Sequence, residues 1–326
     1  MAKYRHHLPQ LSNNLFLTDG GLETTLIFHK GIDLPEFAAF DLLKHEAGYR
    51  TLQNYFHTYL TLAREYQVGF ILESVTWRAN SDWGNKLGYS SAALAEVNHK
   101  AIALLHTLRQ KYETKQTPLV ISGCIGPRGD GYIPSAMMTI DEAADYHRPQ
   151  IEVLRDAEAD LVTAMTINYA EEAIGIVLAA QAANIPVVIS LTLETDGKLP
   201  TGQSLKAAIA QVDQATNNAP AYYMINCAHP THFADALTTD EAWVKRIRGI
   251  RANSSMRSHA ELNELPDLDE GNPAELGTQY RNLRTQFPHL TVLGGCCGTD
   301  DRHIAAICKA CLPVLWSSVS GQLPRL

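Results

Sequence analysis

The sequence predicts an α/β protein folded as a (β/α)8 TIM-type barrel, on three observations. Short β-rich apolar runs recur along the chain, each run ends in a small, polar or cysteine residue, and a helical pattern follows each run. This alternation is typical of parallel strands joined by crossover helices. Eight such units are the number that closes a barrel of this kind. The predicted strands cover residues 15–18, 69–72, 119–122, 161–164, 187–193, 222–225, 249–252 and 290–293.

The segments between these runs carry helix signals. After the first strand, apolar residues follow the i, i+3, i+4 spacing of one helix face, namely Leu52, Tyr55, Phe56, Tyr59, Leu60 and Ala63. Thr139 and Glu142 form a capping-box pattern that opens a helix through about Leu154. Pro149 falls inside this helix, where a proline can produce a kink. Residues 253–272 show little periodicity, which predicts a long loop at the active site or at an oligomer contact.

Length and charge limit the kinds of protein that the chain can be. We expect one barrel domain over residues 1–326 with a short C-terminal extension over 312–326. The chain has 27 Lys and Arg residues against 35 Asp and Glu residues, so its formal charge is −8 and a basic surface for nucleic acid is excluded. The first ten residues lack an apolar secretion signal, and no apolar run approaches the roughly 18 residues that span a bilayer. We therefore expect a soluble cytoplasmic protein that acts on small molecules, with no nucleic-acid or membrane partner; its oligomeric state is left open.

Three of the six cysteines follow predicted strands. Cys227 follows the sixth strand, and Cys296 and Cys297 follow the eighth within the motif Gly-Gly-Cys-Cys-Gly-Thr at 294–299. The carboxyl ends of all strands of such a barrel face one mouth, so these thiols should converge. Neighbouring residues of a strand point to opposite faces, and the glycines of the motif allow the backbone to leave strand geometry. Three thiolates suit Zn²⁺ and leave a fourth position for substrate, as in a catalytic zinc site. The alternative is that the cysteines pack as small apolar residues.

The remaining pair, Cys308 and Cys311, forms a Cys-x-x-Cys pattern. Redox pairs of this type lie at a helix N-terminus, which lowers the pKa of the thiol. The helix here is expected to begin by Asp300 or Asp301, which places this pair near its other end. We therefore interpret these two cysteines as structural, and we expect zinc-thiolate chemistry rather than disulfides at the predicted mouth.

The chain resembles the homocysteine S-methyltransferase family over nearly its whole length. The resemblance rests on Asp19-Gly20-Gly21, Gly126-Pro127, Asn226-Cys227 and the motif at 294–299. It implies a (β/α)8 barrel whose Zn²⁺ is held by Cys227, Cys296 and Cys297, with no catalytic residue beyond the metal site. It also implies methyl transfer to the sulfur of homocysteine, which gives methionine.

The resemblance also suggests residues that bind the substrates. Asp19 is the expected partner of the homocysteine ammonium, and the amides of Gly20 and Gly21 are a possible nest for its carboxylate; an Asp-Gly turn is the alternative. Glu73 either binds substrate or pairs with Arg78. The donor is expected to be a cationic small molecule such as S-methylmethionine, S-adenosylmethionine or betaine. Aromatic rings attract such cations, and the candidates, with core packing as their alternative role, are Trp77, Trp83 and Tyr132.

One departure from the family pattern follows the fourth strand. The family usually supplies a glutamate there for the substrate ammonium, whereas this chain has Met165 and Asn168, and the next carboxylates, Glu171 and Glu172, should begin a helix. Either Glu73 or Glu194 replaces the missing group, or the acceptor is another thiol or a selenol. A non-catalytic barrel that binds zinc or a ligand is a further alternative. No dinucleotide, P-loop or His-Glu-x-x-His motif is present, and we expect no metal ligand among the histidines His229, His259 and His303.

Overall fold

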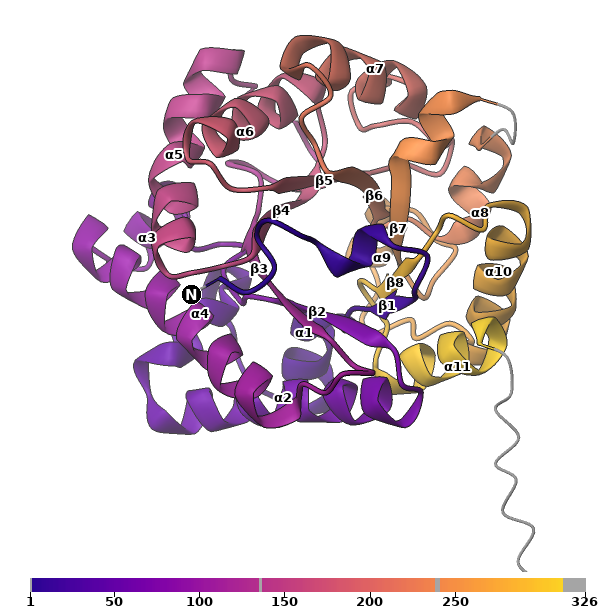
Figure 1. Ribbon diagram of the computed structural model, residues 1–326, viewed down its shortest axis with the longest axis horizontal. Helices are drawn as coiled ribbons and strands as arrows, with labels where there is room; N and C mark the ends of the chain where they lie inside the picture. The colour runs from indigo at the N-terminus through magenta and orange to yellow at the C-terminus, as the bar shows by residue number, and fades with distance from the viewer. Residues whose placement is uncertain (1, 135–136, 238–240, 313–326) are drawn as a thin grey trace, which may run out of the picture.

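The computed structural model contains a closed barrel of parallel strands in the order β1 to β8 (Figure 1), as the sequence predicts. It describes residues 2–134, 137–237 and 241–312, so nearly all of the expected extension over 312–326 lies outside the described residues. The strands are β1 Phe16–Leu17, β2 Gly69–Glu73, β3 Leu119–Ile125, β4 Leu161–Ile167, β5 Val187–Thr192, β6 Tyr222–Asn226, β7 Ile247–Ala252 and β8 Val292–Gly295.

Several strand limits differ from the predicted ones because pairing, and not local composition, sets them. β8 is shifted toward the C-terminus, since Val292 pairs with both Phe16 of β1 and Gly249 of β7. β7 begins at Ile247, two residues earlier than predicted, through its pairing with Tyr223. β1 is shorter than predicted, and β3 and β4 each continue for three further residues.

Helices surround the barrel and cover the outer face of the strands (Figure 1). The predicted capping box of Thr139 and Glu142 is present at the start of α5, and Pro149 lies within that helix. The predicted loop over 253–272 contains one short helix, α9, which begins with a second capping box formed by Ser258 and Glu261. The helices are α1 Leu22–Thr24, α2 Glu46–Glu65, α3 Ser81–Lys86, α4 Ser91–Tyr112, α5 Ile140–Asp156, α6 Ala170–Ala182, α7 Leu205–Thr216, α8 Pro230–Phe233, α9 His259–Asn263, α10 Pro273–Gln286 and α11 Asp301–Cys311.

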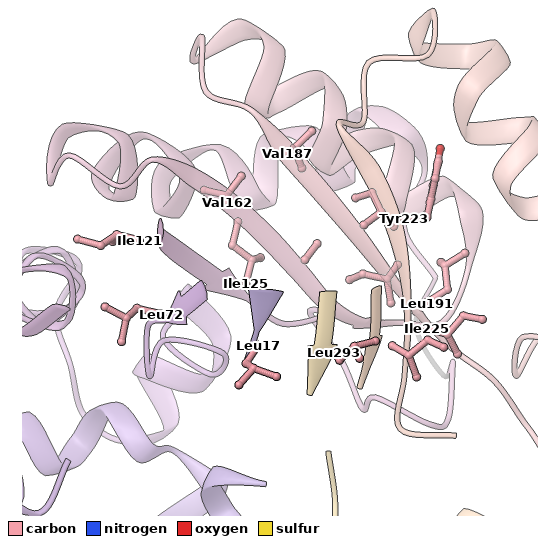
Figure 2. Close-up of a cluster of buried hydrophobic side chains, with 14 of the residues drawn as sticks. Leu17, Leu72, Ile121, Ile125, Val162, Val187, Leu191, Tyr223, Ile225 and Leu293 are labelled. Carbon is pink, nitrogen blue, oxygen red and sulfur yellow. The ribbon is translucent and has the colours of Figure 1, made fainter. Parts of the chain in front are cut away.

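Side chains alternate between the two faces of the strands. Those on the outer face, such as Leu72, Val162 and Leu293, pack against the helices (Figure 2). The predicted apolar face of α2 lies in the same cluster, and all six of its residues are buried. This outer layer contains most of the buried apolar residues. Its packing holds each strand in place, and with it the residues at the strand's carboxyl end.

The inner face of the barrel has an apolar lower layer and a polar upper layer. The lower layer contains Phe16, Ile71, Val120, Leu161, Val188, Tyr222, Met224 and Val292. Because side chains on one face recur every two residues, the next inward positions carry polar groups, namely Thr18, Glu73, Ser122, Thr163, Ser190, Asn226 and Arg251. The polar layer lies nearer the carboxyl ends of the strands and forms the floor of the mouth.

The N-terminal segment closes the opposite end of the barrel (Figure 1). Leu8 is buried within the lower apolar layer, and Tyr4 packs against it. The Tyr4 N–H donates to Asp160 Oδ1 at 2.8 Å, and the other oxygen of this carboxylate accepts from Arg109 at 2.6 Å. The segment is thereby tied to the base of the barrel by polar contacts as well as by burial.

Within the described part of the chain, no helix has both the length and the apolar character that crossing a membrane requires.

Candidate metal centre

The sulfur atoms of Cys227, Cys296 and Cys297, here called the cysteine cluster, lie within 4.8 Å of one another at the carboxyl end of the barrel. The sequence predicts this convergence, and the backbone explains it. Cys227 follows β6 with a positive φ of 53°, and the other two cysteines follow Gly295, the last residue of β8. The chain has therefore left strand geometry where the three side chains turn toward one point.

Two glycines of the motif are required by close approach. A Cβ atom at Gly294 would lie 1.8 Å from Thr18 Oγ1, so any side chain there would displace β1. Gly298 has a φ of +78°, and a Cβ atom on it would lie 2.0 Å from Ser254 Oγ. These positions hold the cysteines between β1 and the loop that follows β7.

Within the cluster, the structure brings the sulfurs of Cys227 and Cys296 into contact, with their Cα atoms 5.5 Å apart. Cys297 is a free, exposed thiol. Three sulfurs that converge on one point can hold one metal ion when they are thiolates, so a metal held by all three requires the reduced chain.

Asn226 organises the groups beneath Cys227. Its side-chain N–H donates to Cys227 Sγ at 3.1 Å and to Thr166 Oγ1 at 2.9 Å. Its carbonyl oxygen accepts from Ser190 Oγ at 2.6 Å and from the Thr166 N–H at 3.0 Å. Thr166 has a positive φ of 61° within β4, at the point where the register of β4 against β5 shifts. Every polar atom of the Asn226 side chain is thus committed to placing Cys227.

The loop after β7 folds over the exposed side of the cluster. The Ser254 N–H donates to the carbonyl of Cys297 at 3.1 Å. Farther along the loop, the ring of His259 stacks on Tyr132 with centroids 4.0 Å apart, and the Tyr132 hydroxyl lies 3.5 Å from Cys297 Sγ. Burial lowers the pKa of His259 to about 4, so this ring is neutral at neutral pH. The prediction of an active-site loop at 253–272 agrees with this placement.

Asp19 lies at the end of β1 as predicted, but it is buried in an ion pair. Arg251 donates to Asp19 Oδ1 at 2.7 Å, and the Tyr55 hydroxyl donates to Oδ2 at 2.8 Å. Burial acts to lower the pKa of Arg251, yet the charges of Asp19 and Glu73 outweigh it and the net shift is upward. The charge of Asp19 is therefore compensated from within the chain.

One of the two amides of the expected carboxylate nest at Gly20 and Gly21 is used within the chain. The Gly21 N–H donates to the carbonyl of Thr299 at 2.9 Å and also approaches its hydroxyl at 3.2 Å. This amide is consequently used to join β1 to the end of the cysteine motif. Gly20 fits closely below Tyr59, whose hydroxyl would lie 2.9 Å from a Cβ atom at this position.

Glu73 points into the barrel from the end of β2 and is 6% exposed. Burial raises the pKa of its carboxyl to about 7, while the charge of Arg251 and hydrogen bonding to Ser122 and Thr163 oppose the shift. Its Oε2 atom has no hydrogen-bond partner among the described residues. The proposed pairing of Glu73 with Arg78 is wrong, because Arg78 instead donates to the carbonyl of Gly129 at 3.1 Å.

Two of the three candidate cation-binding aromatics already contact a cation of the chain. The Arg78 guanidinium carbon lies 4.3 Å from the centre of the Trp77 ring and 3.7 Å from that of Trp83, and Lys86 Nζ lies 3.8 Å from the Trp83 ring. These two indoles therefore hold Arg78 at the mouth. Tyr132 is the candidate that contacts the cysteine cluster.

The segment after β4 contributes no carboxylate to the cluster. The Asn168 side chain donates to the carbonyls of Asp130 and Gly131, at 2.9 and 3.1 Å. Glu171 and Glu172 lie in the first turn of α6, as predicted, and the buried Glu172 accepts from His147 at 2.8 Å. Burial raises the pKa of Glu194, and the largest charge effects on it come from Asp196 and His232. Glu194 follows Leu193, whose backbone is hydrogen-bonded to His259, so its role as a replacement for the missing glutamate stays a prediction.

The remaining predicted cysteines and histidines lie in and beside helices. Cys308 and Cys311 lie in the last turns of α11, which begins at Asp301, and burial raises the pKa of both thiols. His229 caps α8, and His303 forms a capping box with Asp300. Neither histidine belongs to the cysteine cluster.

Sequence reasoning missed three charged residues of the mouth. Arg251 had a usable signal, because it lies two residues after Gly249 on a strand that lines the barrel and must therefore face inward. Arg78 was considered only as a partner of Glu73. Glu23 was overlooked, although α1 carries it beside the cysteine motif.

A closed barrel whose strand ends bring three cysteines together defines a barrel protein with a mouth suited to thiolate and metal chemistry. The chain belongs to the homocysteine S-methyltransferase family, whose model matches residues 16–311, and it is a methyltransferase of that family. It is 27% identical to the selenocysteine Se-methyltransferase of Brassica oleracea var. italica, over 90% of this chain and 88% of that protein. It is 23% identical to homocysteine S-methyltransferase 1 of Arabidopsis thaliana, over 90% and 92% of the two chains.

The fold is similar to that of the homocysteine methyltransferase MmuM from Escherichia coli. The oxidized form of that protein superposes with a TM-score of 0.71 at 19% identity, covering 94% of this chain and 99% of the other. Its metallated form superposes with a TM-score of 0.68 at 18% identity, covering 93% and 98%.

Proposed function

We propose that this protein is a zinc-dependent methyltransferase that moves a methyl group from a small cationic donor to the thiol of homocysteine, giving methionine. The observation that carries the proposal is the convergence of three cysteine sulfurs within 4.8 Å at the barrel mouth. Family membership supports the reaction class. The donor class rests on chemistry. Transfer of a methyl group from a sulfonium or a quaternary ammonium leaves a neutral sulfide or amine behind.

The residues present fit zinc rather than a harder cation. Cysteine sulfur is a soft ligand, and the described cluster contains no carboxylate or carbonyl set of the kind that Mg²⁺ or Ca²⁺ requires. Asn226 donates to one sulfur and Tyr132 lies within reach of another, so both can stabilise thiolates. When bound, zinc supplies the acidity that ionises the acceptor thiol at neutral pH.

The chain itself positions the acceptor. Three cysteine ligands would leave room on a bound metal for a substrate sulfur. Tyr132, which stacks on His259, lies beside Cys297 in this part of the site. Asp19, Gly20 and Gly21 follow β1 and, with Glu73 in the polar layer beneath, form the floor on which we place the acceptor. A fixed acceptor and a bound donor convert the transfer into a step between two aligned groups.

A selenol is the second candidate acceptor. The relative in Brassica oleracea var. italica is named a selenocysteine Se-methyltransferase, and this chain lacks a carboxylate after β4. A selenolate would occupy the same position beside the cysteine cluster. Homocysteine and selenocysteine would therefore compete for one site, although they differ in chain length as well as in the reacting atom.

The test is a transfer assay on the reduced, zinc-loaded chain. Homocysteine or selenocysteine is incubated with S-methylmethionine, S-adenosylmethionine or betaine, and the methylated product is measured by mass spectrometry. Formation of methionine that depends on both zinc and the cysteine cluster supports the proposal. No transfer to homocysteine with any of the three donors, beside transfer to selenocysteine, replaces the first candidate by the second. No transfer at all favours a non-catalytic zinc-binding barrel.

A further inference from the structure

Two opposite charges at the mouth, those of Glu23 and Arg78, take part in no ion pair with residues 2–134, 137–237 and 241–312. Arg78 is only 7% exposed, and its Nε atom has no hydrogen-bond acceptor. The charges of Asp130 and Glu23 act on Arg78 without forming an ion pair with it. A buried cation outside any ion pair is costly, so a role in binding an anion is a physical reason for keeping one.

Glu23 is held beside the cysteine cluster by residues close to it in sequence, Gly21 and Thr24. On one side, the Gly21 N–H donates to Thr299, and on the other, Thr24 Oγ1 accepts from the Gly298 N–H at 3.0 Å. Both partners belong to the motif that carries Cys296 and Cys297. The short helix is thus fastened to the cluster at both ends, with Glu23 between the two contacts. The negative charge of Glu23 acts to raise the pKa of Cys297, of Tyr132 and of Arg78.

Arg78 is held on the other side of the mouth. Its guanidinium lies against Trp77 and Trp83 and donates to the carbonyl of Gly129. Trp77 in turn donates to the carbonyl of Met165 at 3.2 Å, next to the residue that contacts Cys227. Contact with the two indole rings and the Gly129 carbonyl restrains the guanidinium and leaves Nε and the second terminal nitrogen for a ligand, and a carboxylate can accept from both.

We propose that Glu23 and Arg78 are specificity-determining residues that bind the ammonium and the carboxylate of an amino-acid substrate whose sulfur lies at the cysteine cluster. This inference deepens the proposed function and rests on it. Glu23 supplies the carboxylate that is missing after β4. Asp19 is less suited to that role because Arg251 already neutralises it. The pair selects an α-amino acid over a simple thiol, since a ligand that lacks either group leaves one charge unpaired.

The test uses methionine as the probe, because methionine needs neither a free thiol nor transfer to bind. Its binding to the full chain is followed by tryptophan fluorescence, to which Trp77 and Trp83 are sensitive, and by calorimetry. Two analogues isolate the charges: methylthiobutanoate lacks the ammonium, and methylthiopropylamine lacks the carboxylate.

The variants should separate the two charges. Glu23→Gln should weaken methionine and methylthiopropylamine by about tenfold or more and leave methylthiobutanoate unchanged. Arg78→Gln should weaken methionine and methylthiobutanoate by a similar factor and leave methylthiopropylamine unchanged. Should Arg78→Gln not fold, Arg78→Lys, which keeps the charge but not the planar fork, should show the same selectivity with a smaller loss. The matched controls Glu36→Gln and Arg128→Gln remove exposed charges near Arg78 and should change nothing.

Equal losses for all three ligands in one variant would overturn the assignment, because that pattern indicates a structural effect. Unchanged methionine binding in both variants would also overturn it. These outcomes are separate from the fate of the proposed reaction. A chain that binds methionine with this selectivity but transfers no methyl group refutes the methyltransferase proposal alone. A chain that transfers to homocysteine with affinity unaltered by Glu23→Gln and Arg78→Gln refutes the charge pair alone.

Discussion

Replacement of Glu73 by Gln should change how stability depends on pH. Burial raises the pKa of Glu73 from 4.5 to about 7 in the folded chain. The folded state therefore keeps a proton that the unfolded state loses between these two values. Because the unfolded state then binds fewer protons, the free energy of unfolding falls as pH rises through this window. A difference of about 2.5 in pKa corresponds to about 3 kcal/mol, at roughly 1.4 kcal/mol for each pH unit.

Glutamine resembles the protonated carboxyl and does not ionise. Glu73→Gln and the parent chain should therefore have similar free energies of unfolding near pH 4.5, and the variant should be more stable by about 3 kcal/mol near pH 8. Urea unfolding at a series of pH values, with equal metal content, measures this difference. Glu152→Gln on the exposed face of α5 is the matched control for loss of a carboxylate. A difference between Glu73→Gln and the parent that stays within about 0.5 kcal/mol at every pH would refute a buried, protonated Glu73.

Four further predictions concern the mouth. Alanine at any position of the cysteine cluster should remove the one zinc expected per chain. The double replacement of Cys308 and Cys311 should keep this zinc. Metal analysis of the purified variants measures both, and loss of zinc in the double variant would contradict the assignment. Homocysteine binding to the zinc-loaded chain should release a proton, so a calorimetric heat that does not depend on buffer ionisation would exclude thiol ligation. Asn226→Ala should weaken zinc by about 10- to 100-fold in chelator competition, and an unchanged affinity would deny Asn226 its orienting role. Asp19→Asn should lower the free energy of unfolding by about 3–5 kcal/mol, because Arg251 stays buried without its partner. A loss below about 1 kcal/mol in urea unfolding would mean that solvent or Glu73 compensates the charge of Arg251.

The barrel was predictable because its signals are local and repeated. Each β-rich run and each helix face recurs with its own period, so the count and the order of the strands follow without knowledge of contacts. The limits of β1, β7 and β8 were misjudged because pairing across the closed sheet decides them. The Cys227–Cys296 pair was also unpredictable, since spacing along the chain does not say which of three convergent sulfurs meet.

The candidate site was predictable only where a residue ends a strand. Asp19, Glu73, Cys227 and the cysteine motif all lie where the barrel rule places them. Arg78 and Glu23 lie in segments without periodicity, and their directions depend on contacts with Gly129 and with the residues beside Cys297. The compensation of Asp19 by Arg251 joins β1 to β7, two strands that are far apart in sequence.

The N-terminal segment closes the base of the barrel, so the barrel is open to substrates at its other end only. With Leu8 and the apolar layer sealing one side, nothing can pass through the barrel axis. Under the proposed function, acceptor, donor and both products would therefore all enter and leave at the carboxyl end of the strands, where the cysteine cluster lies. A reactant that binds deeper in the barrel would have to bind before its partner, and its product would leave last. One shared entrance would thus give an ordered sequence of binding and release, which the chemistry of methyl transfer alone does not require.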